Sequence, residues 1–210
     1  MSIILHHLNE SRSFRILWLL EQIKQPYELK TYLRDKKTIL APEELKSIHP
    51  LGKSPVIELD GKVIAESGAI VEILIQKFAP QLRPDQDSDS YIAYLQWIHF
   101  SESSAMLPLL LKIFNSVESK HGTQLKFIDQ YAEVELDKVF SYLDQQLKNK
   151  KFLVNNQLTG ADFMMGFVVY NLIKYLGSRS KYSYIEQYLK NLEALESWKQ
   201  AMIIEKNLNN

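Results

Sequence analysis

The chain has 210 residues, a length that suits one large domain or two small ones. Its 25 Lys and Arg residues balance its 25 Asp and Glu residues, so no overall charge draws it to nucleic acid or to an anionic membrane. It has no cysteine, which excludes disulfides, cysteine zinc sites and a thiol nucleophile supplied by the protein.

No secretory signal or membrane span is expected. The N-terminal residues MSIILHHLNES lack the basic segment and the long apolar segment of a secretory signal. The longest apolar-rich run, 163–173, is about half of the roughly 20 residues that a membrane-spanning helix needs. We therefore expect a cytoplasmic protein that has neither a membrane partner nor a nucleic-acid partner.

The first third of the chain alternates strand and helix signals. The apolar run 3–5 predicts a buried strand, and 12–24 predicts a helix because its apolar residues recur at helical spacing. Apolar and polar residues alternate over 27–33, which indicates a second strand. A short helix near 42–47 comes next.

A hairpin and another helix complete this part. The segments VIEL and KVIA are separated by Asp60-Gly61, a pair that favours a two-residue turn. The following helix carries an apolar stripe from Ala69 to Phe78. The order is β-α-β-α-β-β-α, and it predicts an α/β domain over 1–79.

Beyond a polar, proline-containing linker at 80–90, the pattern is helical, so an all-α domain is predicted over 88–210. One long helix is expected from 91 to about 117, and another over 125–147. At 158–163, Thr159 and Asp162 have the spacing of a capping box at a helix start. Asp162 is therefore interpreted as a folding signal, with a catalytic role as the alternative.

These features resemble the soluble glutathione S-transferases. The resemblance rests on the strand order, the proline before the hairpin, the Glu66-Ser67 pair after it and the LTGAD box at 158–162. It implies a thioredoxin-like N-terminal domain that binds glutathione, and an all-helical domain that supplies most of the pocket for a hydrophobic electrophile. It also implies a homodimer that uses glutathione as a co-substrate, with no metal and no other cofactor.

The resemblance assigns glutathione contacts on both flanks of the hairpin. Ser54 would pair through its main chain with the cysteinyl part of glutathione, ahead of a cis Pro55, whose alternative is an ordinary trans proline at a strand start. Ser67 and the helix N-terminus would hold the γ-glutamyl carboxylate, and Glu66 the ammonium group, unless the pair is a plain helix cap. Lys53 would reach the glycyl carboxylate, or it is a solvated surface residue.

The reactive sulfur would come from glutathione, because the protein has no thiol. A free thiol of pKa about 8.5 is only about 3% ionised at pH 7, and lowering that pKa by two units takes roughly 2.7 kcal/mol. One hydrogen bond to a charged group contributes about 1.5–3 kcal/mol. One hydroxyl at a helix N-terminus is therefore enough.

By resemblance, that hydroxyl belongs to Ser11, which matches the catalytic serine of the serine-type, theta-like members. Ser13 is the second candidate, and Ser11 as the cap of the first helix is the structural alternative. The loop ESRS departs from the triplet of the maleylacetoacetate isomerase-like members, and the cysteine-type members are excluded for want of cysteine. The expected function is transfer of the glutathione thiolate to small apolar electrophiles, with peroxide reduction as a further activity; the alternative is a non-catalytic binding or protein-interaction module.

Overall fold

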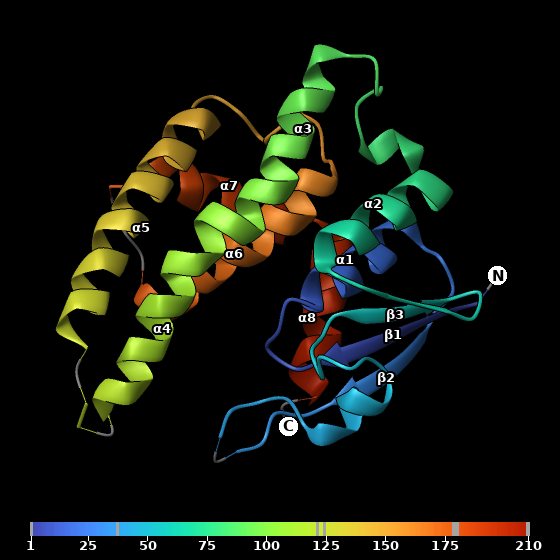
Figure 1. Ribbon diagram of the computed structural model, residues 1–210. Helices are drawn as coiled ribbons and strands as arrows, with labels where there is room; N and C mark the ends of the chain where they lie inside the picture. The colour runs from blue at the N-terminus through green and yellow to red at the C-terminus, as the bar shows by residue number, and fades with distance from the viewer. Residues whose placement is uncertain (1, 37, 121, 124, 178–180, 209–210) are drawn as a thin grey trace. The chain divides into compact units, whose positions relative to one another are not determined.

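The computed structural model describes residues 2–36, 38–120, 122–123, 125–177 and 181–208, which form the helices and strands of Figure 1. The chain divides into two compact units. The first comprises Met1–Leu82 together with Leu192–Asn210, and the second comprises Arg83–Asn191.

The first unit is built on a four-stranded mixed sheet of order β2-β1-β3-β4. The strands are β1 (Ile3–Leu8), β2 (Glu28–Tyr32), β3 (Val56–Leu59) and β4 (Lys62–Ala65). β1 and β2 are parallel, so a helical crossover, α1 (Phe14–Ile23), joins them. The other neighbouring pairs are antiparallel. This is the thioredoxin-like sheet that the resemblance implied, with the strand order that the sequence pattern predicted.

The hairpin turn has the predicted form. Asp60 and Gly61 both have positive φ, 51° and 78°, which is the backbone of the turn that matches strand twist in two-residue hairpins. The turn sets the pairing of Leu59 with Lys62 and therefore the register of β3 against β4.

The helices of the first unit include the last helix of the chain. A 3₁₀ segment, η1 (Glu43–Ser47), follows β2, and α2 (Ser67–Phe78) follows the hairpin. α1 packs against α2 and against α8 (Glu196–Leu208), and Figure 1 shows α8 beside α1. The domain limits 1–79 and 88–210 divide the chain by sequence order, whereas α8 lies with the first unit by its packing.

The second unit is helical. Its helices are α3 (Asp89–Phe100), α4 (Met106–Lys120), α5 (Lys126–Leu147), α6 (Gly160–Leu176) and α7 (Ser183–Glu193), the last of which crosses the limit of the unit. Another 3₁₀ segment, η2 (Pro80–Leu82), ends the N-terminal part of the first unit. No helix in the described part of the chain is long and apolar enough to cross a membrane.

The helix predicted from 91 to about 117 is present, but it is not a regular α-helix throughout. A π-helical segment, Ser101–Ala105, separates α3 from α4. Pro108 follows it, and a proline inside a helix has no N–H for the carbonyl four residues earlier and crowds that carbonyl. The hydroxyl of Ser101 also bonds the carbonyl of Trp97 at 2.7 Å. Both features widen the helix locally, and the apolar spacing of the sequence does not reveal them.

The capping box at the start of α6 is present as predicted. Asp162 Oδ2 accepts the main-chain N–H and the hydroxyl of Thr159, at 2.8 and 3.2 Å. Its Oδ1 accepts the N–H of Leu153 at 3.0 Å and the hydroxyl of Tyr188 at 2.9 Å. Burial raises the pKa of Asp162 to about 6, although these four bonds favour the ionised form. The folding interpretation of Asp162 therefore has a structural basis.

Candidate active site

The register of three strands brings the two flanks of the hairpin to the carboxyl end of β1. His6 pairs with Val56, and Val56 pairs with Ala65. Leu8 therefore lies alongside the residues that precede β3. Glu66, which follows β4, lies near the same end of the sheet. The peptide bond between Ser54 and Pro55 is cis, as the resemblance implied.

The hydroxyl of Ser54 bonds the main chain of β1 and fixes the position of the residue there. Its Oγ donates to the carbonyl oxygen of His6 at 2.8 Å and accepts the N–H of Leu8 at 3.3 Å, and the residue is 8% exposed. Among the described residues, no main-chain group bonds the main-chain N–H or C=O of Ser54. Both groups are therefore available to pair with an extended peptide, the geometry by which a peptide adds to a sheet edge.

Ser11 and Ser13 lie in the turn between β1 and α1. Ser13 is the N-cap residue of α1, and its side chain makes no capping bond. Ser11 Oγ accepts the N–H of Ser13 at 3.2 Å and lies 2.8 Å from Ser13 Oγ. Ser13 is fully buried and also bonds Leu8 and His7, whereas Ser11 is 6% exposed. Ser11 is the outer hydroxyl of the two, so the geometry favours it over Ser13 for contact with a ligand.

The start of α2 holds the acidic-serine pair. Glu66 is exposed, with φ 70°, and occupies the N-cap position without a capping bond from its side chain. Ser67 is 3% exposed, and its Oγ accepts a hydrogen bond from Nη1 of Arg15 at 3.0 Å. Arg15 is fully buried in α1. A guanidinium thus reinforces the positive end of the helix dipole at this place, which favours a bound carboxylate.

Sequence reasoning missed three contributors: Arg15, His7 and Glu205. Arg15 could have been found from the sequence, because a charged residue inside the apolar run FRILWLL signals a buried charge with a partner. His7 bonds Ser13 through Nδ1 at 2.8 Å and contacts Glu205 through Nε2 at 2.9 Å. Glu205 lies nearly two hundred residues away, so no local pattern pointed to it.

The structure thus joins most of the predicted residues and leaves two at the surface. Hydrogen bonds link Ser11 and Ser54 through Ser13 and Leu8, and Pro55 follows Ser54 directly. Ser67 is linked to α1 by the hydrogen bond that its hydroxyl accepts from Arg15. Lys53 and Glu66 are exposed at either flank.

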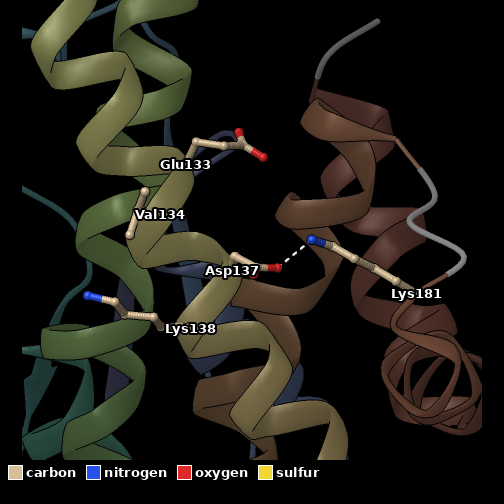
Figure 2. A pocket seen from close by; sticks show the side chains of 5 residues that line it. All are labelled: Glu133, Val134, Asp137, Lys138 and Lys181. Carbon is tan, nitrogen blue, oxygen red and sulfur yellow. Dashed lines mark hydrogen bonds and ion pairs between the residues drawn. The ribbon is translucent and has the colours of Figure 1, made fainter.

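A surface pocket in the second unit contains none of the predicted site residues. Figure 2 shows its lining, in which Asp137 forms an ion pair with Lys181. The other lining residues are Glu133, Val134 and Lys138 of α5. Charged side chains that already neutralise one another give this pocket no evident ligand chemistry. No group of acidic or histidine side chains in the described part of the chain is arranged to hold a metal ion.

Comparisons with known proteins agree with the fold. Residues 1–75 match the family described as "Glutathione S-transferase, N-terminal domain", and residues 108–208 match "Glutathione S-transferase, C-terminal domain". The chain is 32% identical to glutathione S-transferase 3 of Schizosaccharomyces pombe over 203 residues, which cover 90% of this chain and 81% of the relative. It is 31% identical to glutathione S-transferase 1 of Saccharomyces cerevisiae, over 92% of this chain and 91% of the relative.

A solved structure leads to the same result. The crystal structure of a glutathione S-transferase from Actinobacillus pleuropneumoniae matches 97% of this chain and 93% of its own, with a TM-score of 0.85 and 34% identity. The similarity extends over both units of the fold and is accompanied by substantial sequence identity. The chain belongs to the glutathione S-transferase family.

Proposed function

We propose that this protein is a serine-type, theta-like glutathione transferase that transfers the thiolate of glutathione to small apolar electrophiles. The observation that carries the proposal is the hydroxyl of Ser11 at the end of β1, beside Ser54 and a cis Pro55. Family membership supplies glutathione as the expected co-substrate, and the arrangement of these residues supports a place for its sulfur.

Glutathione would lie along the end of the sheet in an extended form. The free main-chain groups of Ser54 would pair with the cysteinyl residue. Ser67, backed by Arg15 and the N-terminus of α2, would hold the γ-glutamyl carboxylate, and Glu66 would meet the ammonium group. Lys53 would meet the glycyl carboxylate at the other end.

In this arrangement Ser11 would donate a hydrogen bond to the thiolate and would not act as a nucleophile. The bond would stabilise the thiolate where it attacks the electrophile, and little of Ser11 itself is exposed to water. Binding of both reactants in one site would supply the remaining rate enhancement through proximity.

Several finer features stay predictions, some from the resemblance and some from the sequence pattern. They are a hydrophobic electrophile as second substrate, glutathione-dependent peroxide reduction as a further activity, a homodimer, a cytoplasmic location, the absence of a further cofactor, and folding domains over 1–79 and 88–210. Light scattering in solution would test the dimer, because a monomeric mass contradicts it.

The second candidate function is a non-catalytic glutathione-binding or interaction module, because a fold by itself does not determine activity. The intact hydroxyl at Ser11 and the Arg15–Ser67 contact argue against it, since a scaffold needs neither. Failure to bind glutathione by calorimetry would favour this second candidate.

The test of the proposed function is the Ser11→Ala variant assayed with glutathione and a chloronitrobenzene. Loss of a hydrogen bond to a charged group costs about 1.5–3 kcal/mol, so kcat/KM should fall by about 10- to 100-fold. Ser116→Ala, which removes an exposed hydroxyl in α4, serves as the control and should be unaffected. Equal activity of Ser11→Ala and the wild type would show that the role of Ser11 is wrong.

A further inference from the structure

Glu10 lies directly before Ser11 and has an uncommon main-chain conformation. Its φ is 51°, in the left-handed region that residues other than glycine rarely adopt. The β-carbon crowds the main chain in this region. The conformation is therefore unfavourable by itself, and it persists only where neighbouring groups hold it in place.

Two charged side chains bond the main chain of Glu10. Its N–H donates to Oε1 of Glu205 at 2.6 Å, and its carbonyl oxygen accepts a bond from Nη2 of Arg34 at 3.2 Å. Glu205 belongs to α8, whereas Arg34 follows β2. Hydrogen bonds to charged groups are stronger than those between neutral groups. Both polar main-chain groups of this one residue are thus fixed by side chains from distant parts of the first unit.

The residue before Glu10 is also anchored. The N–H of Asn9 donates to the carbonyl oxygen of Tyr32 at 3.1 Å, and its side-chain oxygen accepts the N–H of Arg34 at 2.9 Å. These bonds extend the contact of β1 with β2 by one residue beyond Leu8. Since the chain is fixed as far as Asn9, the conformation of Glu10 sets the direction in which it continues to Ser11.

The position of the Ser11 hydroxyl therefore depends on the conformation of Glu10. The turn is short, because α1 begins at Phe14. A change in φ at Glu10 would move Ser11 relative to the end of the sheet. Displacement of a catalytic group by about 1 Å can slow a reaction about 100-fold.

Of the two side chains, Glu205 makes the stronger contact with Glu10. Its bond is the shorter one, and the residue is only 8% exposed, so water competes little for the carboxylate. The bond from Arg34 is longer and lies at the surface.

We propose that Glu205 is a positioning residue, whose carboxylate holds Glu10 in its left-handed conformation and thereby places the hydroxyl of Ser11 for a bond to the sulfur of glutathione. Arg34 supports Glu10 from the other side. This inference rests on the proposed role of Ser11, and it adds the last helix of the chain to the machinery that stabilises the thiolate.

The first test compares Glu205→Ala with Glu205→Gln. An amide oxygen can accept the N–H of Glu10, whereas alanine has no acceptor. The readouts are kcat, KM and the pKa of the bound glutathione thiol, which is followed by ultraviolet absorbance of the thiolate against pH.

Glu205→Ala should raise the thiol pKa by about one unit and lower kcat about tenfold, with KM for glutathione changed by less than about twofold. Glu205→Gln should stay near the wild type in all three. Equal values for the two variants would overturn the proposal.

Ser197 provides a matched control in the same helix. It is also 8% exposed, and its hydroxyl bonds Trp18 and Gln22 of α1. Ser197→Ala should lower the stability of the first unit and leave the pKa of the bound thiol unchanged. An equal shift of that pKa in Ser197→Ala and Glu205→Ala would overturn the proposal.

A double-substitution cycle tests whether Glu205 acts through Glu10. The other oxygen of its carboxylate lies 2.9 Å from Nε2 of His7, so the two contacts must be separated. Glycine adopts positive φ about as readily as negative φ, so Glu10→Gly should depend less on the carboxylate. Glu205→Ala should therefore raise the thiol pKa by less in a Glu10→Gly background than in the wild type. The same rise in both backgrounds would refute the action through Glu10.

Hydrogen exchange reports on the bond itself. The amide proton of Glu10 should be protected in the wild type and in Ser197→Ala, and it should exchange at least about tenfold faster in Glu205→Ala. Unchanged protection in Glu205→Ala would contradict the proposal.

A second cycle, with Ser11→Ala, separates this proposal from the proposed function. If Glu205 acts through Ser11, then Glu205→Ala should have no further effect on the thiol pKa in a Ser11→Ala background, and a further rise would overturn the proposal. An effect of Ser11→Ala with none of Glu205→Ala would refute the role of Glu205 alone. No effect of Ser11→Ala would refute the proposed function itself.

Discussion

Arg15 is a buried charge that contacts one of the proposed glutathione-binding residues. Its side chain has no exposed surface, and its guanidinium bonds the hydroxyl of Ser67 at the N-terminus of α2. Burial of a cation is costly, but a nearby anionic ligand repays part of that cost. A carboxylate bound at Ser67 would therefore gain from the charge of Arg15 without contact with it.

Substitution of Arg15 should weaken glutathione binding more than it slows the chemical step. In Arg15→Met we expect the dissociation constant of glutathione to rise about tenfold, which corresponds to about 1.4 kcal/mol. Arg15→Lys, which keeps the charge and loses the planar donor group, should fall between this variant and the wild type. Calorimetric titration measures the constants, and an unchanged constant in Arg15→Met would contradict the role.

At the scale of the element, the start of α6 is organised by one carboxylate. Asp162 accepts hydrogen bonds from Thr159, Leu153 and Tyr188, so it connects the helix start to the preceding loop and to α7. Its pKa is raised from 3.8 to about 6, chiefly by desolvation. The folded state therefore binds this proton more tightly than the unfolded chain does.

The sign of the resulting pH dependence follows from linkage. A raised carboxyl pKa contributes stability at low pH, and that contribution is lost as the pH rises through about 6. Between pH 7 and pH 5, the free energy of unfolding of the wild type should rise by about 1.4 kcal/mol relative to Asp162→Asn. Urea unfolding at both pH values measures the difference.

Asp162→Asn should also be less stable than the wild type at both pH values, by about 2–4 kcal/mol, because an amide cannot accept all four bonds. Asp89→Asn, at an exposed position in the first turn of α3, is the control and should show neither effect. A stability difference between wild type and Asp162→Asn that does not change with pH would contradict the shifted pKa.

At the scale of the whole molecule, the last helix of the chain, α8, packs against the first helix, α1. Trp198 of α8 packs edge-on against Trp18 at 4.7 Å and Phe14 at 5.1 Å, measured between ring centroids. Nε1 of Trp18 donates to the hydroxyl of Ser197 at 3.1 Å. The C-terminal helix thus completes the core of the N-terminal unit.

Trp198→Ala should therefore destabilise the first unit. Truncation of a buried tryptophan costs about 3–5 kcal/mol, and the position is 3% exposed. Ile203→Ala in the same helix is the control, since Ile203 is 51% exposed and should change stability by at most about 0.5 kcal/mol. Thermal unfolding measures both, and a similar loss in the two variants would contradict the packing role of α8.

Local signals in the sequence predicted much of this structure. The Asp60-Gly61 pair predicted the hairpin because it readily adopts positive φ at both turn positions. The spacing of Thr159 and Asp162 predicted the start of α6 because a capping box is made by residues only three apart. The helix from 91 to about 117 was predicted but its π-helical segment was not, because that segment depends on carbonyl contacts that hydrophobic spacing does not encode.

The sequence by itself determined the order of the elements, the turn, the helix cap and the family resemblance that pointed to Ser11, Ser54 and Ser67. These features depend on residues close together in the chain or on motifs in a recognisable order. Only the tertiary structure decided which of the two serines is the outer one, that Arg15 supports Ser67, and that Glu205 faces His7. Such contacts join residues about fifty to two hundred positions apart, and their existence follows from strand register and helix packing, which no local pattern specifies.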